Sequence, residues 1–401
     1  MSTLRQDFSL SAVIAGLIAV IISYAGPLII VFQAAQAAQL SDAQISSWIW
    51  AISIGSGLTG LLLSWRLRIP LITAWSTPGA ALLVALLPTV SLAEAVGAYL
   101  VAALIIALVG LSGAFDSLMR RLPRAIAAAM LAGILFRFGV GLFSSIELQP
   151  LLVLSMLAAY LIAKRLSPRY AILAVLLVGC TVAAALGTLN GGAIQIEFAT
   201  PLFIAPSWSW NAVLNIGLPL ALVTLTGQYV PGMAVLRGAG YATPARPIMA
   251  VTALGSLLLA PFGAHGLNPA AITAAICTGP EAHEAPQRRY IAGIACGLFY
   301  ILMGIFGATL ASLFAALPRE LIAALAGLAL FGAISSGLST AMADEKQREA
   351  ALITFLVTAS GMSFLGLAAA FWGLLFGIAA HFILSATRAR APLAQPAGTV
   401  P

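Results

Sequence analysis

Two apolar stretches, each interrupted near its middle, decide the fold. Residues 70–83 read Pro70-Leu-Ile-Thr-Ala-Trp-Ser-Thr-Pro-Gly-Ala-Ala-Leu-Leu83, and residues 262–277 read Phe262-Gly-Ala-His-Gly-Leu-Asn-Pro-Ala-Ala-Ile-Thr-Ala-Ala-Ile-Cys277. Each holds a capping-type residue followed by proline, Thr77-Pro78 in the first and Asn268-Pro269 in the second. Such side chains accept backbone N–H bonds at an N-cap, and proline is tolerated at the first helical position. Each stretch therefore predicts a helix that begins well inside its apolar run.

The two interruptions are related by an internal repeat. The segment that begins Leu122-Pro-Arg recurs at Leu317-Pro-Arg, 195 residues later, and Pro78 and Pro269 are 191 residues apart. The helix expected from Pro269 to Pro280 would be about 18 Å long at ~1.5 Å per residue, too short to cross a bilayer alone. Two ordinary proline kinks are the alternative interpretation.

The composition is that of a membrane protein. Of 401 residues, 61% are hydrophobic and only 8% are charged, whereas soluble domains carry about a quarter charged residues. Apolar runs long enough to span a bilayer recur from end to end. The first run, Leu10 to Phe32, is expected to be a retained span rather than a signal peptide. We predict an all-α polytopic membrane protein without a soluble domain.

About 14 spans are expected, as two inverted seven-helix repeats with core and gate domains. The predicted domains are residues 1–187 (first repeat), 188–210 (periplasmic connection), 211–387 (second repeat) and 388–401 (cytoplasmic tail). The predicted spans of the first repeat are 10–32, 43–64, 71–90, 93–114, 122–143, 149–164 and 169–187. Those of the second are 211–236, 246–262, 267–280, 289–316, 318–341, 350–367 and 369–387.

The basic residues orient these spans. With the N-terminus in the cytoplasm, 17 of the 19 Lys and Arg residues fall in inside loops, and only Arg137 and Arg319 do not. This bias is typical of a bacterial-type inner membrane protein with both termini cytoplasmic. It also argues that the net charge of +7 reflects topology and that the chain has no nucleic-acid partner. A homodimer is an open alternative to a monomer.

Inverted repeats would point the two interrupted helices toward each other near the bilayer midplane. Their N-termini present free N–H groups and a partial positive charge, which suits a small anion, and inverted repeats around a midplane site are typical of secondary transporters. The first and eighth spans should adjoin this site. The candidate substrate-binding residues are Tyr24, Trp75, Ser76, Thr77, Gly79, Gln228, Tyr229, Asn268 and Ala270. Hydrogen bonds between helices for Tyr24 and Gln228, and lipid or core packing for Trp75, are equally open interpretations.

Several of these motifs resemble the benzoate/proton symporter family. The resemblance rests on Ala74-Trp-Ser-Thr-Pro-Gly-Ala-Ala-Leu-Leu83, Gln228-x-x-Pro-Gly232, Ala270-Ala-Ile-Thr-Ala-Ala-Ile-Cys277, Pro280-Glu-Ala-His283, Leu356-Val-Thr-Ala-Ser-Gly361 and Phe371-Trp-Gly373, and it runs over most of the chain. It implies the seven-plus-seven fold shared with nucleobase and sulfate transporters, and uptake of benzoate or a similar aromatic carboxylate driven by protons. Nucleobase transporters of this fold carry carboxylates where this chain has Gln228 and Asn268, which fits a ligand that brings its own negative charge.

The proton carrier and the intramembrane charge are separate questions. Glu281, His283 and His265 are weak candidates for proton coupling, and the substrate acid could also cross in its protonated form. Arg137 is the one basic residue deep in a span, so we expect a gating or structural charge paired with an acid at the core–gate interface. Direct contact with the anion is the alternative role.

No enzyme chemistry is indicated. Cys180, Cys277 and Cys296 and the scattered histidines have no metal-ligand spacing, and the sequence predicts neither a cofactor, a metal nor catalytic residues. A nucleobase or other small-anion carrier, or an anion channel of the same fold, remains the alternative function.

Overall fold

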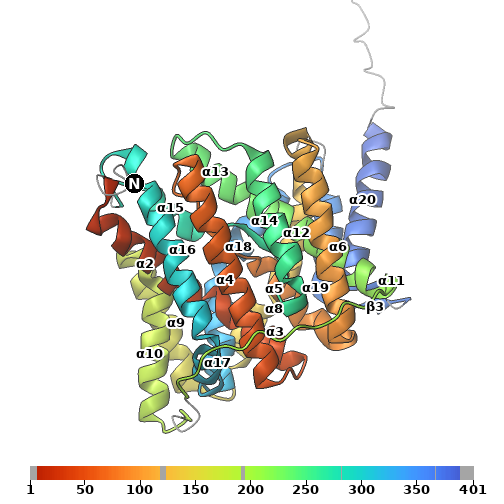
Figure 1. Ribbon diagram of the computed structural model, residues 1–401. Coiled ribbons are helices and arrows are strands. Elements are labelled where there is room, and N and C mark those ends of the chain that lie inside the picture. The colour runs from red at the N-terminus through yellow and green to blue at the C-terminus, as the bar shows by residue number, and fades with distance from the viewer. Residues whose placement is uncertain (1–6, 118–122, 191–194, 281, 366, 389–401) are drawn as a thin grey trace, which may run out of the picture.

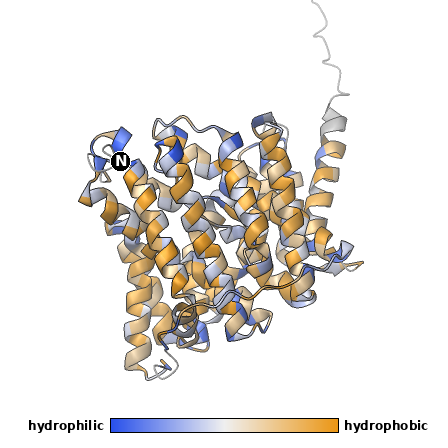
Figure 2. Ribbon diagram, in the orientation of Figure 1, coloured by the Kyte–Doolittle hydropathy of each residue, from blue (hydrophilic) through white to orange (hydrophobic). Residues whose placement is uncertain are grey.

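The computed structural model describes residues 7–117, 123–190, 195–280, 282–365 and 367–388. This part of the chain is mainly helical, and eight of its helices are long and apolar enough to cross a membrane. Their residues are mostly hydrophobic, and hydrophilic residues gather mainly toward the two ends of the molecule (Figure 2). In the first half the helices are α2 (Leu10–Ala25), α3 (Pro27–Ala37), α4 (Asp42–Leu67), α5 (Thr77–Leu86), α6 (Leu92–Leu111), α8 (Arg124–Ser144), α9 (Pro150–Leu166) and α10 (Ala171–Ala185).

The second half repeats this arrangement with more irregular helices. Its first span runs through α11 (Trp210–Ala212), a π-helical stretch (Val213–Gly217), α12 (Leu218–Thr224), a second π-helical stretch (Leu225–Tyr229) and α13 (Val230–Gly238). The remaining helices are α14 (Ala245–Leu259), α15 (Ile272–Thr278), α16 (Tyr290–Ile305), α17 (Gly307–Ala315), α18 (Arg319–Met342), α19 (Arg348–Ser360) and α20 (Ala369–Arg388). The start of α2 and the end of α20 lie on the same side of the molecule, the upper side in Figure 1.

Each of the 14 predicted segments overlaps a described helix or run of helices, but several differ from a single helix. The segment 10–32 is divided at Gly26 into α2 and α3, and the segment 71–90 begins with the strand Thr73–Trp75. The segment 289–316 is divided at Phe306 into α16 and α17. The segment 350–367 ends its helix at Ser360 and continues as a hairpin of β3 (Ser363–Phe364) and β4 (Leu367–Ala368). The helix expected from Pro269 to Pro280 has only seven residues, because Leu267–Pro269 forms a strand instead.

The repeat found in the sequence is visible in the structure. Helix α8 begins at Arg124 after Pro123, and α18 begins 195 residues later at Arg319 after Pro318. The two helices pack side by side. Proline at these N-cap positions has an extended ψ and cannot continue a helix backwards, so both copies start at the same point of the repeat.

The helices pack in two groups. In one group α4 packs on α16, α6 on α14, α2 on α16 and α3 on α5. In the other, α8 packs on α18 and α19, α9 on α10, and α19 on α20. Contacts between the groups are made mainly by α3 with α18 and by α5 with α8. The interrupted spans belong to the first group, and α5 therefore lies at the boundary between the two.

Candidate functional site

The two interrupted spans meet through their backbones. Strand β1 (Thr73–Trp75) pairs antiparallel with β2 (Leu267–Pro269), with Ala74 opposite Asn268. The pairing extends beyond the ladder, because Ser76 N donates to Gly266 O at 3.0 Å and Ala270 N donates to Ile72 O at 2.9 Å. Non-helical backbone inside a membrane must find partners within the protein. Here each break supplies the hydrogen-bond partners of the other break. We call this pairing of Thr73–Trp75 with Leu267–Pro269 the crossing. Helices α5 and α15 begin at its opposite ends.

The cap of α5 is one residue earlier than the sequence suggested. Ser76, not Thr77, is the N-cap, and its Oγ accepts the N–H of Gly79 at 3.1 Å. The same Oγ is 2.8 Å from Oγ1 of Thr224 in α12. Thr77 occupies the first helical position, with Pro78 directly after it. The prediction that Thr77 caps the helix is wrong, because the extended backbone needed at an N-cap is found at Ser76, where β1 has just ended.

Asn268 is also not a helix cap. It lies in β2, and the N-cap position of α15 is Ala271, which offers no side-chain cap. The side chain of Asn268 is fully buried, and neither Nδ2 nor Oδ1 has a hydrogen-bond partner among the described residues. A buried carboxamide without a partner costs about 1–3 kcal/mol, so its place at the crossing calls for a ligand or a compensating role.

The eighth span packs on both breaks. A Cβ added at Gly227 would lie 3.3 Å from Cγ of Pro78, and one added at Gly232 would lie 2.8 Å from O of Pro269. Gln228 lies between these contacts, in the π-helical stretch Leu225–Tyr229. Short π-helical insertions of this kind occur frequently at functional sites. The span is therefore close to both interrupted helices, as the repeat predicted.

The polar groups of this span differ in their partners. Tyr229 is buried, and its hydroxyl is 2.7 Å from Oγ1 of Thr252 and donates to Leu267 O at 3.3 Å. Tyr229 therefore holds β2 in place from the side. Gln228 is half-buried, and no hydrogen bond of its side chain is found in the described parts of the chain. Its carboxamide is the freer of the two groups to meet a ligand.

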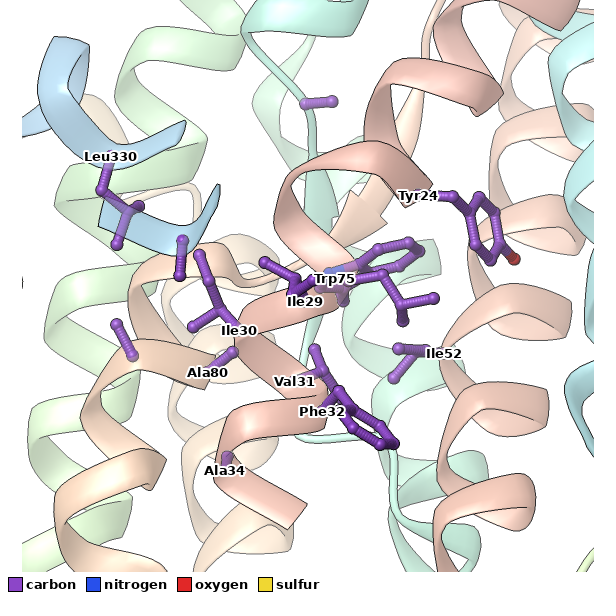
Figure 3. Close-up of a cluster of buried hydrophobic side chains, with 14 of the residues drawn as sticks. Tyr24, Ile29, Ile30, Val31, Phe32, Ala34, Ile52, Trp75, Ala80 and Leu330 are labelled. Carbon is purple, nitrogen blue, oxygen red and sulfur yellow. The ribbon is translucent and has the colours of Figure 1, made fainter. Parts of the chain in front are cut away.

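The first span contributes an aromatic cluster. The ring of Tyr24 is 5.6 Å from that of Trp75 in an edge-on arrangement, and Tyr300 of α16 lies 5.9 Å from each. Figure 3 shows Tyr24 and Trp75 in one buried cluster with Ile29 of α3. The Tyr24 hydroxyl donates to Ser53 Oγ at 2.5 Å, whereas the Trp75 Nε1–H has no partner among the described residues. Trp75 is thus a core residue that keeps one donor unused.

His265 joins the crossing to α4. The indole N–H of Trp48 donates to Nδ1 of His265 at 3.2 Å, and Nε2 is 3.1 Å from the carbonyl oxygen of Ser76. An Nδ1 that accepts requires the proton on Nε2, so the ring is neutral and donates to the Ser76 carbonyl. The residue before the second break thereby fixes the start of α5.

The other proton-coupling candidates lie away from the crossing. His283 is in the loop after α15, where its Nδ1 accepts the N–H of Ala285 at 2.9 Å. Arg289 fixes the same loop by donating to the carbonyl oxygens of Thr278 and His283 at 2.6 and 2.7 Å. Glu281 lies outside the described residues.

A cavity of about 1060 Å³ opens between the two helix groups. It follows α5 from Ala81 toward its C-terminal end, and Ala81 lies about one helical turn beyond the start of α5. Arg137 lines this cavity. The expectation of a buried, acid-paired Arg137 is wrong: the residue is exposed to the cavity, and no ion pair of it occurs among the described residues.

Sequence reasoning missed several residues of this region. Thr224 contacts the cap of α5, Tyr300 completes the aromatic cluster, and Tyr99 places its ring 6.4 Å from His265 with a buried hydroxyl that has no described partner. The sequence marks each of these residues only as a polar or aromatic residue inside an apolar span. Only the pairing of distant helices reveals which of the many such residues meet.

The crossing of two broken spans in a helical membrane protein defines a class of transporter fold. The structure aligns with that of SLC26A9 with a TM-score of 0.64 and 15% identity, covering 96% of this chain and 66% of that one. It also aligns with the transmembrane domain of the cyanobacterial bicarbonate transporter BicA with a TM-score of 0.56 and 15% identity, covering 94% and 97%. At such identities the likeness concerns the fold alone, which is the inverted-repeat fold of these transporters.

The sequence gives the narrower assignment. Residues 6–383 match the family model of the benzoate membrane transport protein, BenE. The chain is 56% identical to the benzoate membrane transport protein of Acinetobacter baylyi over 384 residues, which are 96% of this chain and 98% of that protein. It is 43% identical to the inner membrane protein YdcO of Escherichia coli over 372 residues, 93% and 95% of the two chains. This protein belongs to the benzoate membrane transport protein family.

Proposed function

We propose that this protein is a secondary active transporter that takes up benzoate, or a related small aromatic carboxylate, together with protons across the inner membrane. The family and the 56% identity to the Acinetobacter baylyi protein support the substrate class. One observation carries the site: Asn268 is fully buried at the crossing of two interrupted spans, with an amide that no described residue satisfies.

The crossing offers donors and aromatic surface, which is what an aromatic carboxylate requires. Asn268 Nδ2 is an unused donor on one face of the ladder, and Trp75 Nε1, on the adjacent pair of the register, is an unused donor on the opposite face. The N–H groups of residues 271–274 precede the first intrahelical bond of α15, which Ala275 donates to Ala271 O. A carboxylate that accepts such bonds makes charge-assisted hydrogen bonds. The other proposed contacts are Tyr24, Ser76, Thr77, Gly79, Gln228, Tyr229 and Ala270.

Two of these contacts act through position rather than through free donors. The N–H of Ala270 is used by Ile72, and the N–H of Gly79 is used by Ser76. Their lack of bulk lets a ligand approach the two helix starts. Ser76 holds the start of α5 and Tyr229 holds β2. We therefore propose that these two residues set the shape of the site and do not bind the ligand through free donors.

The transport cycle would move the two helix groups against each other. The group that contains the crossing is the proposed core domain, and the group built on α8 and α18 is the proposed gate domain. The cavity stops about one turn short of the start of α5, so a displacement of α5 along α8 would connect it with the crossing. Both termini are assigned to the cytoplasm, which makes the cavity periplasmic.

We propose four candidates for the group that carries the proton. Glu281 and His283 follow the tenth span in the sequence, His265 lies at the crossing, and the acid itself could carry the proton. Protonation of His265 would turn Nδ1 into a donor and break the bond from Trp48, so His265 would carry a proton only with a movement of α4 or β2.

The test is uptake of labelled benzoate into proteoliposomes with an imposed pH gradient. Protein-free liposomes are the essential control, because a neutral carboxylic acid crosses bilayers by itself and accumulates on the alkaline side. We expect saturable uptake above this background that unlabelled benzoate abolishes and uracil and sulfate do not. Competition by uracil or sulfate would favour a nucleobase or inorganic-anion carrier. Passive flux far above ~10³ per second, the upper range of typical turnover numbers, would favour a channel.

A further inference from the structure

The cavity between the helix groups contains unpaired positive charge. Its charged lining residues are Arg137 of α8, Arg319 of α18 and Asp42 at the start of α4. Both arginines are exposed to the cavity, and neither forms an ion pair within the part of the chain that the structure describes. Glu320, the neighbour of Arg319, is not among the lining residues. Two cations against one anion leave a net positive charge.

The position of Arg137 is built into the fold. Gly361 ends α19 with φ +66°, and a Cβ added there would lie 2.9 Å from Nη1 of Arg137. The glycine is required for its left-handed backbone, and it also leaves room for the guanidinium at the cavity wall. An arginine inside a membrane protein is expensive unless it faces a water-filled space or a partner. The cavity supplies the water-filled space.

The rest of the cavity lining includes polar side chains that could bind a carboxylate weakly and transiently. Gln33, Gln36 and Gln39 follow α3 to its end and line the cavity with the two arginines. Guanidinium groups bind carboxylates through paired N–H donors and are less strongly hydrated than ammonium groups. Both arginines are on helices of the α8–α18 group. They would therefore keep their place in the gate domain when the core domain, with the crossing, moves relative to it.

We propose that Arg137 and Arg319 form an outer recruitment site that concentrates small carboxylate anions in the cavity before they reach the crossing. The ligand class rests on the proposed function, whereas the positive potential follows from the cavity and its two arginines. A low-dielectric cleft lined by one sign of charge raises the local concentration and arrival rate of the opposite charge, and salt screens this effect. The site therefore acts on the apparent affinity at low salt and not on the maximal rate.

A labelling experiment measures the potential without any transport. Ser363 of β3 is exposed and lines the cavity near Gly361, and a Ser363→Cys variant would report on it in detergent solution. The readout is the ratio of modification rates by an anionic and a cationic methanethiosulfonate reagent, corrected with the parent protein for Cys180, Cys277 and Cys296. Cys277 and Cys296 are buried and Cys180 is half-buried, so the parent protein measures a background that comes mainly from Cys180.

The expected result is a ratio that falls roughly 3- to 10-fold in the Arg137→Gln, Arg319→Gln double variant at about 0.01 M salt, where the Debye length is about 30 Å, and differs little at about 1 M, where it is about 3 Å. Lysine at both positions should keep the ratio, and Asp42→Asn should raise it. Arg165→Gln, at the far end of α9 and outside the lining, is the matched control. The proposal would be overturned if the ratio of modification rates in the double glutamine variant equalled that of the parent at low salt, while the double lysine variant folds normally.

Transport then tests the ligand class. In proteoliposomes the double glutamine variant should raise the KM for benzoate several-fold at low salt, leave the maximal rate within about twofold, and match the wild type at high salt. A wild type that does not transport benzoate would overturn the proposed function, while the labelling ratio would still decide the recruitment site. A KM that is unchanged at low salt, in a wild type that transports, would refute recruitment of the substrate.

Discussion

The Asn268→Leu substitution should raise the stability of the free protein and weaken the binding of substrate at the crossing. The two side chains are similar in size and both branch at Cγ, so the substitution removes the amide with little change in volume. In the free protein the amide is buried without a described partner, at a cost of about 1–3 kcal/mol. The variant should therefore unfold at a higher temperature than the wild type when no substrate is present.

Binding should change in the opposite direction. A hydrogen bond from Nδ2 to a substrate carboxylate is a bond to a charged group, worth about 1.5–3 kcal/mol. Its loss predicts a Kd for benzoate that is roughly 10- to 150-fold higher, at ~1.4 kcal/mol per factor of ten. Thermal unfolding in detergent with increasing benzoate measures both effects, because the substrate should raise the unfolding temperature of the wild type much more than that of the variant.

The same exchange at a satisfied asparagine is the matched control. Asn215 is buried, and its Oδ1 accepts the N–H of Ala368 at 2.7 Å while its Nδ2 donates to Asn211. Asn215→Leu should lower the unfolding temperature, since it leaves the Ala368 N–H without that acceptor. An Asn268→Leu variant that is destabilised like Asn215→Leu, or one that binds benzoate with unchanged affinity, would refute the assignment of Asn268 to the substrate site.

Three further predictions concern the framework of the crossing. Ser76→Ala removes the cap of α5 and should cost about 0.5–2 kcal/mol of stability, measured by denaturant or thermal unfolding; an unchanged stability would show that another group takes over the cap. Gly232→Ala forces a Cβ against Pro269 O and should cost about 1–3 kcal/mol, whereas Gly238→Ala in the same helix meets no atom within 4 Å and should be neutral or slightly stabilising. His265→Leu removes two buried hydrogen bonds and should lower stability by about 1–3 kcal/mol; if stability is kept and only proton-driven accumulation is lost, His265 is the proton carrier instead.

The positions of the breaks could be predicted from the sequence, but their geometry could not. Pro78 and Pro269 limit where a helix can start, because proline lacks an N–H and excludes a helix that continues from before it. Which residue then caps the helix depends on the strand before it. Asn268 is drawn into β2 by pairing with Ala74, 194 residues away, and no local propensity contains that information.

The surroundings of the polar residues were equally beyond local patterns. Arg137 looked like a buried charge because its neighbours in the sequence are apolar, but a cavity between two helix groups supplies its water. His265 was a weak candidate for proton coupling in the sequence, and only the structure shows that Trp48 and Ser76 use both of its ring nitrogens. The π-helical turn at Leu225–Tyr229 left no recognisable signal either. Charge, spacing and repeat point to the candidate site, and long-range contacts determine its geometry.

The short ladder between β1 and β2 has a consequence for biosynthesis. Ala74 leaves the ribosome 194 residues before its partner Asn268, an interval of roughly 10 to 40 s at ~5–20 residues per second. Throughout that time the backbone of Thr73–Trp75 is inserted, or waits to be inserted, without the hydrogen bonds that it has in the finished protein. The insertion machinery or bound water must shelter this segment, so the second repeat completes the folding of the first.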